Sequence, residues 1–296
     1  VLYFHNDPLS MAGSKSIKER VKLISGCSKI IFNSEWSKKR FLLNLDSIYY
    51  KSNKLQVIHQ SINKEKINIL KKENVITFVG KLNLAKGYDL FGNAIIKILN
   101  QYPNWKSIVI GDEPREQINF THKNLKNIGF QNHKKVLDIF KKTSISVACS
   151  RWEEPFGRTS LEAASRGCAV IISNRGGLPE TITNGVILQK LTSSNVYKQI
   201  KRLIDDKKQR IKLQKLSLKN FYLTDEFICK KIDDYRGTLL NNNKIKYTTL
   251  KKLDKLKILH VTNFNERHNG RLFYNTGKRI NNGFVRLNHS VLEFSD

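Results

Sequence analysis

The segment after Ser150, which reads RWEEPFGRTSLEAASRG, carries the residue types best suited to chemistry. Pro155 and Gly157 predict a tight turn, and the pattern that follows predicts a helix beginning at about Gly157. The first backbone N–H groups of a helix have no partner within it, and they carry the positive end of the helix dipole. The N–H groups from Gly157 to Ser160 can therefore hold a phosphate.

Two carboxylates flank this turn. Glu162 lies about one turn into the predicted helix, on the same face as Arg158 and Thr159. A carboxylate there can accept two hydrogen bonds from a vicinal diol such as a ribose. Glu154 precedes the turn and can reach a group beyond the phosphate. The alternative is that Glu162 is an exposed helical residue and Glu154 a loop charge, and the spacing leaves both interpretations open.

Two lysines flank another predicted helix start. Gly80 and Lys81 end an apolar run, and Lys86 and Gly87 precede a helical pattern. A cation in the first turn opposes the helix dipole by about 0.3–1 kcal/mol, which favours an anion bound between them. Two solvated lysines in a lysine-rich chain are the alternative. The Gly-Lys-Ser/Thr ending of a Walker loop and the GxGxxG of a nicotinamide or flavin site are both missing from the sequence.

A third segment, from Asn174 to Glu180, contains two adjacent glycines. Gly176 and Gly177 follow an apolar run, and glycine lets a backbone approach a ligand closely. An ordinary turn is the alternative for this segment.

The elements that must position these segments form a regular alternation. Apolar runs of strand length alternate with helical patterns, which predicts an α/β fold with a doubly wound parallel sheet. Ligands bind at the carboxyl ends of such strands, where the segments above lie. The predicted strands cover 1–4, 29–33, 55–58, 75–79, 107–110, 145–148, 168–172 and 186–188, and the predicted helices include 87–99, 134–141, 157–166, 194–204, 208–219 and 224–239. Ser34 is predicted to cap a further helix.

Both ends of the sequence resemble interrupted domains. Val1 begins within a strand-like run, and residues 257–296 read as the opening strand–helix–strand unit of a new α/β domain, behind a polar, lysine-rich linker at 241–256. We expect a fragment of a longer protein, or a tail that completes another part of the structure.

The composition limits the class of protein. Lys and Arg total 53 against 25 Asp and Glu, a net charge of +28, which suits nucleic acid, an anionic membrane or a phosphorylated ligand. The lysines are spread along the whole chain, however, and a genomic bias towards Lys, Asn and Ile produces the same excess. No apolar run is long enough to span a membrane, and the given residues show no charged-then-apolar pattern typical of a signal peptide. The four cysteines form no CxxC pair, so we expect free core thiols in a reducing, cytoplasmic compartment.

Glu154-Pro-Phe-Gly-x4-Glu162 resembles the Glu-x7-Glu signature of retaining GT-B glycosyltransferases, specifically glycosyltransferase family 4 (group 1). Further segments resemble the family in the same order along the chain: Phe78 to Gly87, Ile110 to Asp112 and Val147 to Ser150. The resemblance covers about residues 1–240 and implies a GT-B-type, Rossmann-like fold. It implies that residues 1–65 are the end of an N-terminal Rossmann-like domain and that residues 70–222 form the C-terminal Rossmann-like domain, which binds the donor nucleotide. A helix at 223–240 would cross back to the N-terminal domain. Residues 257–296 would begin a second, truncated glycosyltransferase-like domain.

The resemblance also implies residue roles. Lys81, Lys86 and the start of the helix at Gly157, Arg158 and Thr159 would bind the donor diphosphate, and Glu162 the ribose. Lys81 occupies the position where the family usually has Arg. The positive charge is kept, but a lysine cannot form the two parallel hydrogen bonds that an arginine makes to a phosphate. The transferred sugar would be contacted by Glu154, Pro155 and Phe156, with His5 and Glu154 as the catalytic residues. Arg20 is a further candidate for a phosphate contact, and Gln60-Ser61 replaces the Asn-Gly common at the family's hinge.

The activity implied is hexosyl transfer (EC 2.4) from a nucleotide sugar, such as a UDP- or GDP-sugar, to a glycan or lipid-linked acceptor, with retention of configuration. Polysaccharide or lipopolysaccharide biosynthesis is the implied setting, without a metal or other cofactor. Most of the acceptor site would lie in N-terminal residues outside this chain. A peripheral contact with an anionic membrane is compatible with the charge. The alternatives are a basic module that binds nucleic acid or an anionic membrane, and a degenerate transferase kept for structure. Nucleic acid is not expected, because aromatic and basic residues are not interleaved.

Overall fold

The computed structural model describes residues 1–116, 118–242, 255–261 and 276–294. The chain divides into two compact units, Val1–Gly237 and Thr238–Asp296. The candidate chemistry described above lies entirely in the first unit.

The first unit begins with a small parallel sheet. Its three strands, β1 (Leu2–Phe4), β2 (Ile30–Phe32) and β3 (Leu55–Val57), pair in that order. The helices α1 (Ile17–Gly26) and α2 (Glu35–Leu42) connect them. Ser34 caps α2 as predicted, because its hydroxyl accepts a hydrogen bond from the N–H of Ser37.

The core of this sheet explains the placement of Arg20. Phe4, Phe32 and Phe41 pack with ring centroids 5.2–5.5 Å apart. Arg20 on α1 is 3% exposed, and its guanidinium donates to the carbonyl oxygens of Phe41 and Leu43 at the end of α2. The prediction that Arg20 contacts a phosphate is therefore wrong for this structure, because the group is buried and occupied by carbonyl groups.

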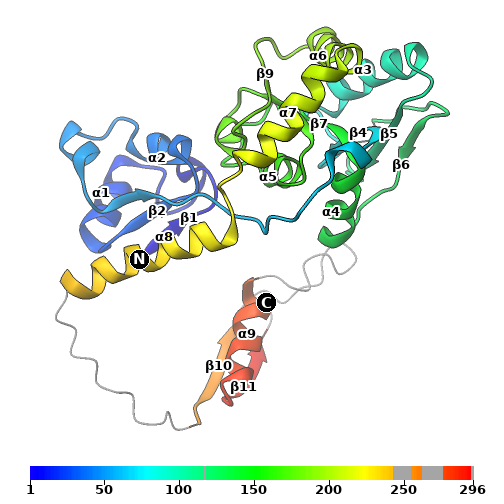
Figure 1. The fold of residues 1–296 in the computed structure, drawn as a ribbon. Helices are drawn as coiled ribbons and strands as arrows, with labels where there is room; N and C mark the ends of the chain where they lie inside the picture. Colours follow the sequence, from blue (N-terminus) through cyan, green and yellow to red (C-terminus); the bar gives the residue numbers. More distant parts are fainter. Residues whose placement is uncertain (117, 243–254, 262–275, 295–296) are drawn as a thin grey trace. The chain divides into compact units, whose positions relative to one another are not determined.

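A larger sheet follows, with six parallel strands in the order β6-β5-β4-β7-β8-β9 (Figure 1). These strands are β4 (Glu73–Val79), β5 (Lys106–Ile110), β6 (Leu125–Asn127), β7 (Thr143–Ala148), β8 (Ala169–Ser173) and β9 (Val186–Leu188). The predicted doubly wound parallel sheet is confirmed, with one strand added. The sequence did not indicate β6, because this short edge strand is polar and only partly buried.

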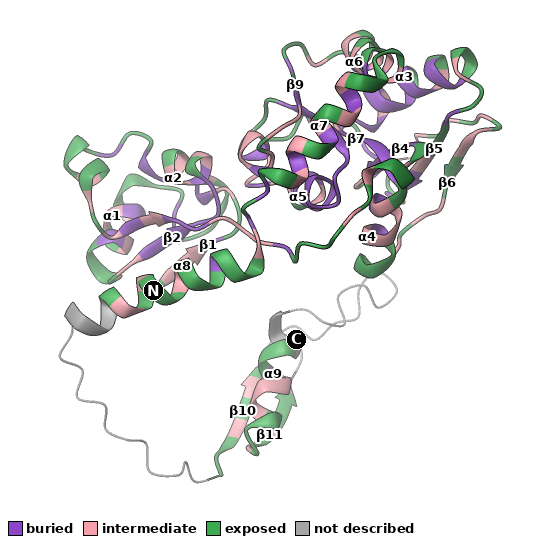
Figure 2. Ribbon diagram, in the orientation of Figure 1, coloured by how far each residue is buried: buried purple, intermediate pink, exposed green. Residues whose placement is uncertain are grey.

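Helices cover both faces of the six-stranded sheet. One apolar cluster joins α3 (Tyr88–Gln101) and α6 (Ser193–Asp205) to the strands, and a second cluster joins α4 (His133–Lys142) and α5 (Arg158–Ser165). The central strands are accordingly buried on both faces (Figure 2). The helix α7 (Lys207–Lys219) contacts α5 and α6, and leads to α8 (Asp225–Asn242).

The apolar core continues between the two sheets of the first unit. Ile31 and Ile58 from the small sheet belong to the same buried cluster as Phe156, which precedes α5, and Ile228 on α8. The Lys231 ammonium on α8 also donates to the carbonyl of Val57, at 3.1 Å. These contacts hold α8 to the small sheet (Figure 1).

The second unit contains β10 (Lys257–Val261), α9 (Thr276–Arg286) and β11 (Ser290–Phe294). The two strands are parallel, so the predicted strand–helix–strand unit is confirmed in its described part. Residues 262–275 of this predicted unit lie outside the described residues. So does most of the predicted linker at 241–256, although α8 extends two residues into it, to Asn242.

The cysteines differ in their surroundings. Cys149 and Cys168 are buried core thiols, as expected, whereas Cys27 is half-buried and Cys229 is exposed. The expectation of core thiols is therefore wrong for Cys229, which lies on the outer face of α8. Among the described helices, none has the length and apolarity needed to cross a membrane.

Candidate functional site

A pocket of about 210 Å³ opens where β4 and β7 end and α5 begins. Five of the residues predicted to bind the donor line it: Lys86, Glu154, Gly157, Arg158 and Thr159. The rest of the lining comes from Phe78, Val79, Gly80, Ala148, Ser150 and Leu178. Segments 80 residues apart in the sequence thus meet at the sheet edge where the topology predicts a ligand.

The start of α5 forms one wall of this pocket. Gly157 has φ +108°, a left-handed conformation that favours glycine, and an added Cβ would lie 2.5 Å from the Leu178 side chain. Among the described residues, no side chain caps the helix. Its first N–H groups therefore face a pocket lined by Arg158 and Thr159, and an anion placed there would be favoured by both the N–H groups and the Arg158 charge.

The opposite wall brings a lysine next to a glutamate. Gly87 has φ +72°, and an added Cβ would lie 2.0 Å from the carbonyl oxygen of Cys149, so only glycine lets the start of α3 approach the end of β7 this closely. Lys86 precedes it, and its ammonium lies 2.5 Å from Oε1 of Glu154. The Glu154 side chain is 13% exposed and the Lys86 side chain 33%, so solvent screens this ion pair in part. The structure thus fixes one cation and one carboxylate at the pocket.

Glu162, on α5, is buried at 5% exposure and does not line the pocket. Its Oε1 lies 3.0 Å from Nε2 of His133 and 3.4 Å from Nε of Arg158. The predicted shared face of Glu162 and Arg158 is confirmed by this contact. Sequence reasoning missed His133, the first residue of α4, because 29 residues separate it from Glu162 and nothing in the spacing links them.

Other predicted residues lie outside the pocket lining. Lys81 is exposed beside Gly80, and His5 follows β1, where Gln60 Nε2 lies 3.4 Å from its Nδ1. Partial burial lowers the pKa of His5. The ring of Phe156 is 2% exposed and stacks on His59 with centroids 5.6 Å apart. A sugar contact by Phe156 would therefore have to use its backbone, because its ring belongs to the core.

The segment from Asn174 to Glu180, which contains the two glycines, packs against the backbone of residues 153–157, which we call the signature loop. An added Cβ on Gly176 would lie 2.1 Å from the carbonyl oxygen of Glu154, and one on Gly177 would lie 2.6 Å from that of Pro155. The Gly177 N–H donates to the Glu154 carbonyl at 2.7 Å. The close approach is thus between two parts of the chain, and it fixes the loop that carries Glu154.

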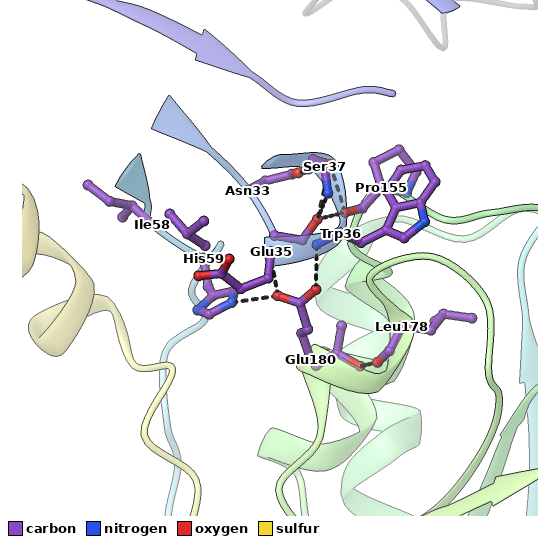
Figure 3. Close-up of polar contacts among 12 residues, drawn as sticks. Asn33, Glu35, Trp36, Ser37, Ile58, His59, Pro155, Leu178 and Glu180 are labelled. Atoms are coloured by element: carbon purple, nitrogen blue, oxygen red, sulfur yellow. Dashed lines mark hydrogen bonds and ion pairs between the residues drawn. The ribbon is translucent and has the colours of Figure 1, made fainter. Parts of the chain in front are cut away.

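Glu180 joins this segment to α2 (Figure 3). Its carboxylate accepts hydrogen bonds from the N–H groups of Glu35, at 2.7 Å, and Trp36, at 3.0 Å, and it lies 3.0 Å from Nε2 of His59. Burial by itself would raise the pKa of Glu180, but these hydrogen bonds together lower it. The Ser34 hydroxyl donates to the Pro155 carbonyl at 2.5 Å, which gives a second link between α2 and the signature loop.

Within the described part of the chain, no group of three or more His, Cys, Asp or Glu side chains is placed to hold a metal ion. The charged groups that the pocket offers a ligand are Lys86, Arg158 and Glu154.

Several curated proteins are similar to this chain. Spore coat protein SA of Bacillus subtilis (strain 168) is 28% identical over 162 residues, which cover 49% of this chain and 43% of that protein. An uncharacterized glycosyltransferase of Methanocaldococcus jannaschii is 29% identical over 204 residues, covering 65% of this chain and 50% of its own length. The chain thus spans about half the length of these curated relatives.

Solved structures show the fold. HepE of Anabaena, in complex with UDP-glucose, superposes with a TM-score of 0.65 at 16% identity, covering 80% of this chain and 71% of HepE. A glycosyltransferase of Rickettsia africae gives a TM-score of 0.67 at 17% identity, covering 81% and 70%. The predicted α/β fold of the GT-B type is confirmed. The family described as glycosyl transferases group 1 matches residues 59–219, which include both walls of the pocket, and the chain belongs to this family.

Proposed function

We propose that the pocket between β4, β7 and α5 binds the nucleoside diphosphate of a nucleotide sugar, and that the chain acts in a retaining hexosyltransferase of glycosyltransferase family 4. One observation carries the proposal. The uncapped start of α5, the Arg158 guanidinium and the Lys86 ammonium all border one pocket, next to the Glu154 carboxylate. In a nucleotide sugar, the two phosphate groups carry negative charge that suits the start of α5, Arg158 and Lys86. The sugar carries hydroxyl groups that can donate hydrogen bonds to the Glu154 carboxylate.

Each side chain then has a role. Lys86, Arg158 and the N–H groups of α5 stabilise the departing diphosphate electrostatically, in place of a metal ion. Glu162, held by His133, accepts hydrogen bonds from the ribose hydroxyls. Glu154 orients the transferred sugar, and His5 approaches the same sugar from the end of β1. Lys81 adds positive charge beside the diphosphate.

In the reaction, an acceptor hydroxyl oxygen forms a bond to the anomeric carbon as the bond from that carbon to the diphosphate oxygen breaks. The hydroxyl proton passes to the departing diphosphate, which leaves as the free nucleotide. Retention requires attack on the face that the diphosphate leaves. While the bond to the diphosphate breaks and the bond to the acceptor forms, positive charge develops at the anomeric carbon, and the Glu154 carboxylate stabilises that charge.

The relatives support a nucleotide-sugar donor and a cell-surface product. HepE was solved with UDP-glucose and with UDP and glucose. LpsB of Rhizobium meliloti (strain 1021), named a lipopolysaccharide core biosynthesis mannosyltransferase, is 28% identical over 116 residues, covering 36% of this chain and 33% of its own length. We therefore propose a UDP- or GDP-sugar donor, a glycan or lipid-linked acceptor, and a place in polysaccharide or lipopolysaccharide biosynthesis in the cytoplasm.

Donor turnover tests this function. The chain is incubated with UDP-glucose, UDP-N-acetylglucosamine, GDP-mannose and ADP-glucose, and release of the nucleoside diphosphate is followed. We expect release from one donor, by hydrolysis or by transfer, and a loss of at least tenfold in Glu154→Gln. Glu226→Gln, an exposed glutamate in the first turn of α8, is the matched control. No release from any donor in folded protein, or equal rates in wild type and Glu154→Gln, would contradict the proposal.

The net charge of +28 favours a second proposal, a peripheral contact with an anionic membrane at its inner face. Vesicles of phosphatidylcholine with and without phosphatidylserine test it by co-sedimentation. We expect binding that requires the anionic lipid and falls steeply as salt is raised. Equal sedimentation with both kinds of vesicle would exclude this contact.

A further inference from the structure

A second pocket, of about 490 Å³, lies beside the proposed donor pocket. Its lining comes from two parts of the first unit: Asp7, Trp36 and Arg40 near the small sheet, and Arg151, Trp152 and Glu153 after β7. The last three residues lie between Ser150 and Glu154, which both line the donor pocket. A molecule in the second pocket would thus be separated from a donor sugar by one short stretch of chain.

Two indole rings dominate the apolar surface of this pocket. Trp152 is 55% exposed, which is unusual for so large an apolar side chain, and Trp36 at the start of α2 is half-buried. The Arg40 guanidinium lies over the Trp36 ring, 5.7 Å from its centroid, so that ring is partly covered. Tryptophan combines a flat apolar face with one N–H donor, and such a surface suits a ligand that is apolar on one face and polar at its edges. The volume lies within the range of small-molecule sites.

The charges around the pocket are already balanced. Arg40 pairs with Asp7 at 3.0 Å, Arg151 pairs with Asp89 at 2.6 Å, and Glu153 pairs with Arg175 at 3.0 Å. A charged ligand would have to compete with one of these pairs for its partner. A neutral ligand with many hydroxyl groups would not, since a paired carboxylate still has lone pairs free to accept further hydrogen bonds.

Carbohydrate rings have these properties. One face of a pyranose presents C–H groups that pack on an indole, and its edges carry hydroxyl groups that donate to carboxylates and accept from guanidinium groups. We propose that the second pocket binds a neutral saccharide unit of the acceptor, with the exposed Trp152 ring as the packing surface and Asp7 and Glu153 as hydroxyl acceptors. This inference rests on the proposed function, because it makes the bound saccharide the acceptor for a sugar held in the first pocket.

Tryptophan fluorescence provides a direct test. The chain has three tryptophans, and the third, Trp105, is 3% exposed in the core, so a saccharide that changes the emission reports on Trp36 and Trp152. The chain is titrated with the methyl glycosides of glucose, mannose, galactose and N-acetylglucosamine, and with glucose 1-phosphate and glucuronic acid as charged counterparts. Nucleoside diphosphate binding is measured separately by calorimetry.

We expect at least one neutral glycoside to give a saturable change and to bind at least as tightly as its charged counterparts. Trp152→Ala should weaken that glycoside by about tenfold, and Trp152→Phe by less, because the ring supplies the packing surface. The affinity for the nucleoside diphosphate should stay within about twofold of wild type, because the Trp152 side chain does not line the donor pocket. Tyr50→Ala, which removes a ring that is 53% exposed and lines neither pocket, should change neither affinity.

Three results would overturn the inference while leaving the donor site standing. They are nucleotide binding with no response to any neutral glycoside, tighter binding of the charged counterparts, and an unchanged glycoside affinity in Trp152→Ala. If Trp152→Ala fails to fold, Trp152→Phe and Glu153→Gln give the same readout. Absence of nucleotide binding in wild type would instead contradict the proposed function, which the calorimetric measurement reports independently.

Discussion

Glu180→Gln should loosen the contact between α2 and the segment after β8. The two side chains have the same shape, but glutamine has one acceptor oxygen in place of two and carries no charge. In the structure, one carboxylate oxygen accepts from the Glu35 N–H and lies by His59, while the other accepts from the Trp36 N–H. The substitution therefore leaves at least one N–H group of α2 facing an amide N–H2 group.

The size of this effect follows from the contacts. A hydrogen bond to a charged group contributes about 1.5–3 kcal/mol. The Glu180 side chain is 22% exposed, so solvent screens part of this, and we expect a loss of about 2 kcal/mol in the free energy of unfolding. For a unit of this size, that loss lowers the melting temperature by about 4–8 °C.

The effect should also depend on pH. The pKa of Glu180 is lower in the folded protein than its ordinary value, so the ionised carboxylate stabilises the fold above the pKa of the unfolded chain, about 4.3. That contribution is lost as the pH falls through the folded pKa, because the protonated group can no longer accept all these bonds. The difference between wild type and Glu180→Gln should be full at pH 7 and shrink below about pH 4.

Thermal unfolding followed by circular dichroism and by tryptophan emission measures both effects. Glu226→Gln, in the exposed first turn of α8, controls for the loss of one negative charge at a helix start. A melting temperature for Glu180→Gln equal to that of the control would refute the reasoning. So would a difference from wild type that persists undiminished at pH 3.

Three further predictions concern single residues. Lys86→Ala should weaken nucleoside diphosphate binding by about tenfold in calorimetry, since one charge-assisted contact is lost, and an unchanged affinity would exclude Lys86 from the site. Gly87→Ala should destabilise the fold by about 2 kcal/mol or more, because Gly87 has φ +72° and the added Cβ would collide with the carbonyl oxygen of Cys149. Gly237→Ala is the control and should be neutral or stabilising, since nothing lies within 4 Å of its added Cβ. Equal melting temperatures for the two variants would contradict this prediction. In native protein a maleimide should label the exposed Cys229 and spare Cys149, whose pKa burial raises to about 12, and equal labelling rates would refute this placement.

The sequence predicted the larger sheet well because its strands are buried on both faces. Such strands read as continuous apolar runs, as at Val75 to Val79, and the helices between them show their apolar spacing. The edge strand β6 carries no such run, and it was missed for that reason. The local prediction at Ser34 succeeded because a helix cap depends only on its immediate neighbours.

The candidate site was predictable where it lies on one continuous segment. Glu154 to Glu162 is such a segment, and its turn, helix start and face could be worked out from spacing. Contacts between distant segments could not. His133 meets Glu162 across 29 residues, and His59 meets Glu180 across 121, because the packing of several elements brings each pair together. The two tryptophans of the second pocket gave no signal in the sequence for the same reason.

The proposed donor site is tested most directly by a calorimetric titration of the chain with UDP, GDP and ADP, in wild type and in Glu162→Gln. We predict saturable binding of one nucleotide at one site, and a loss of at least tenfold in the variant, because the amide replaces a carboxylate that accepts from the ribose hydroxyls. Absence of binding by all three nucleotides in folded protein would contradict the assignment of the pocket. Equal affinity in Glu162→Gln would contradict the proposed contact of Glu162 with the ribose.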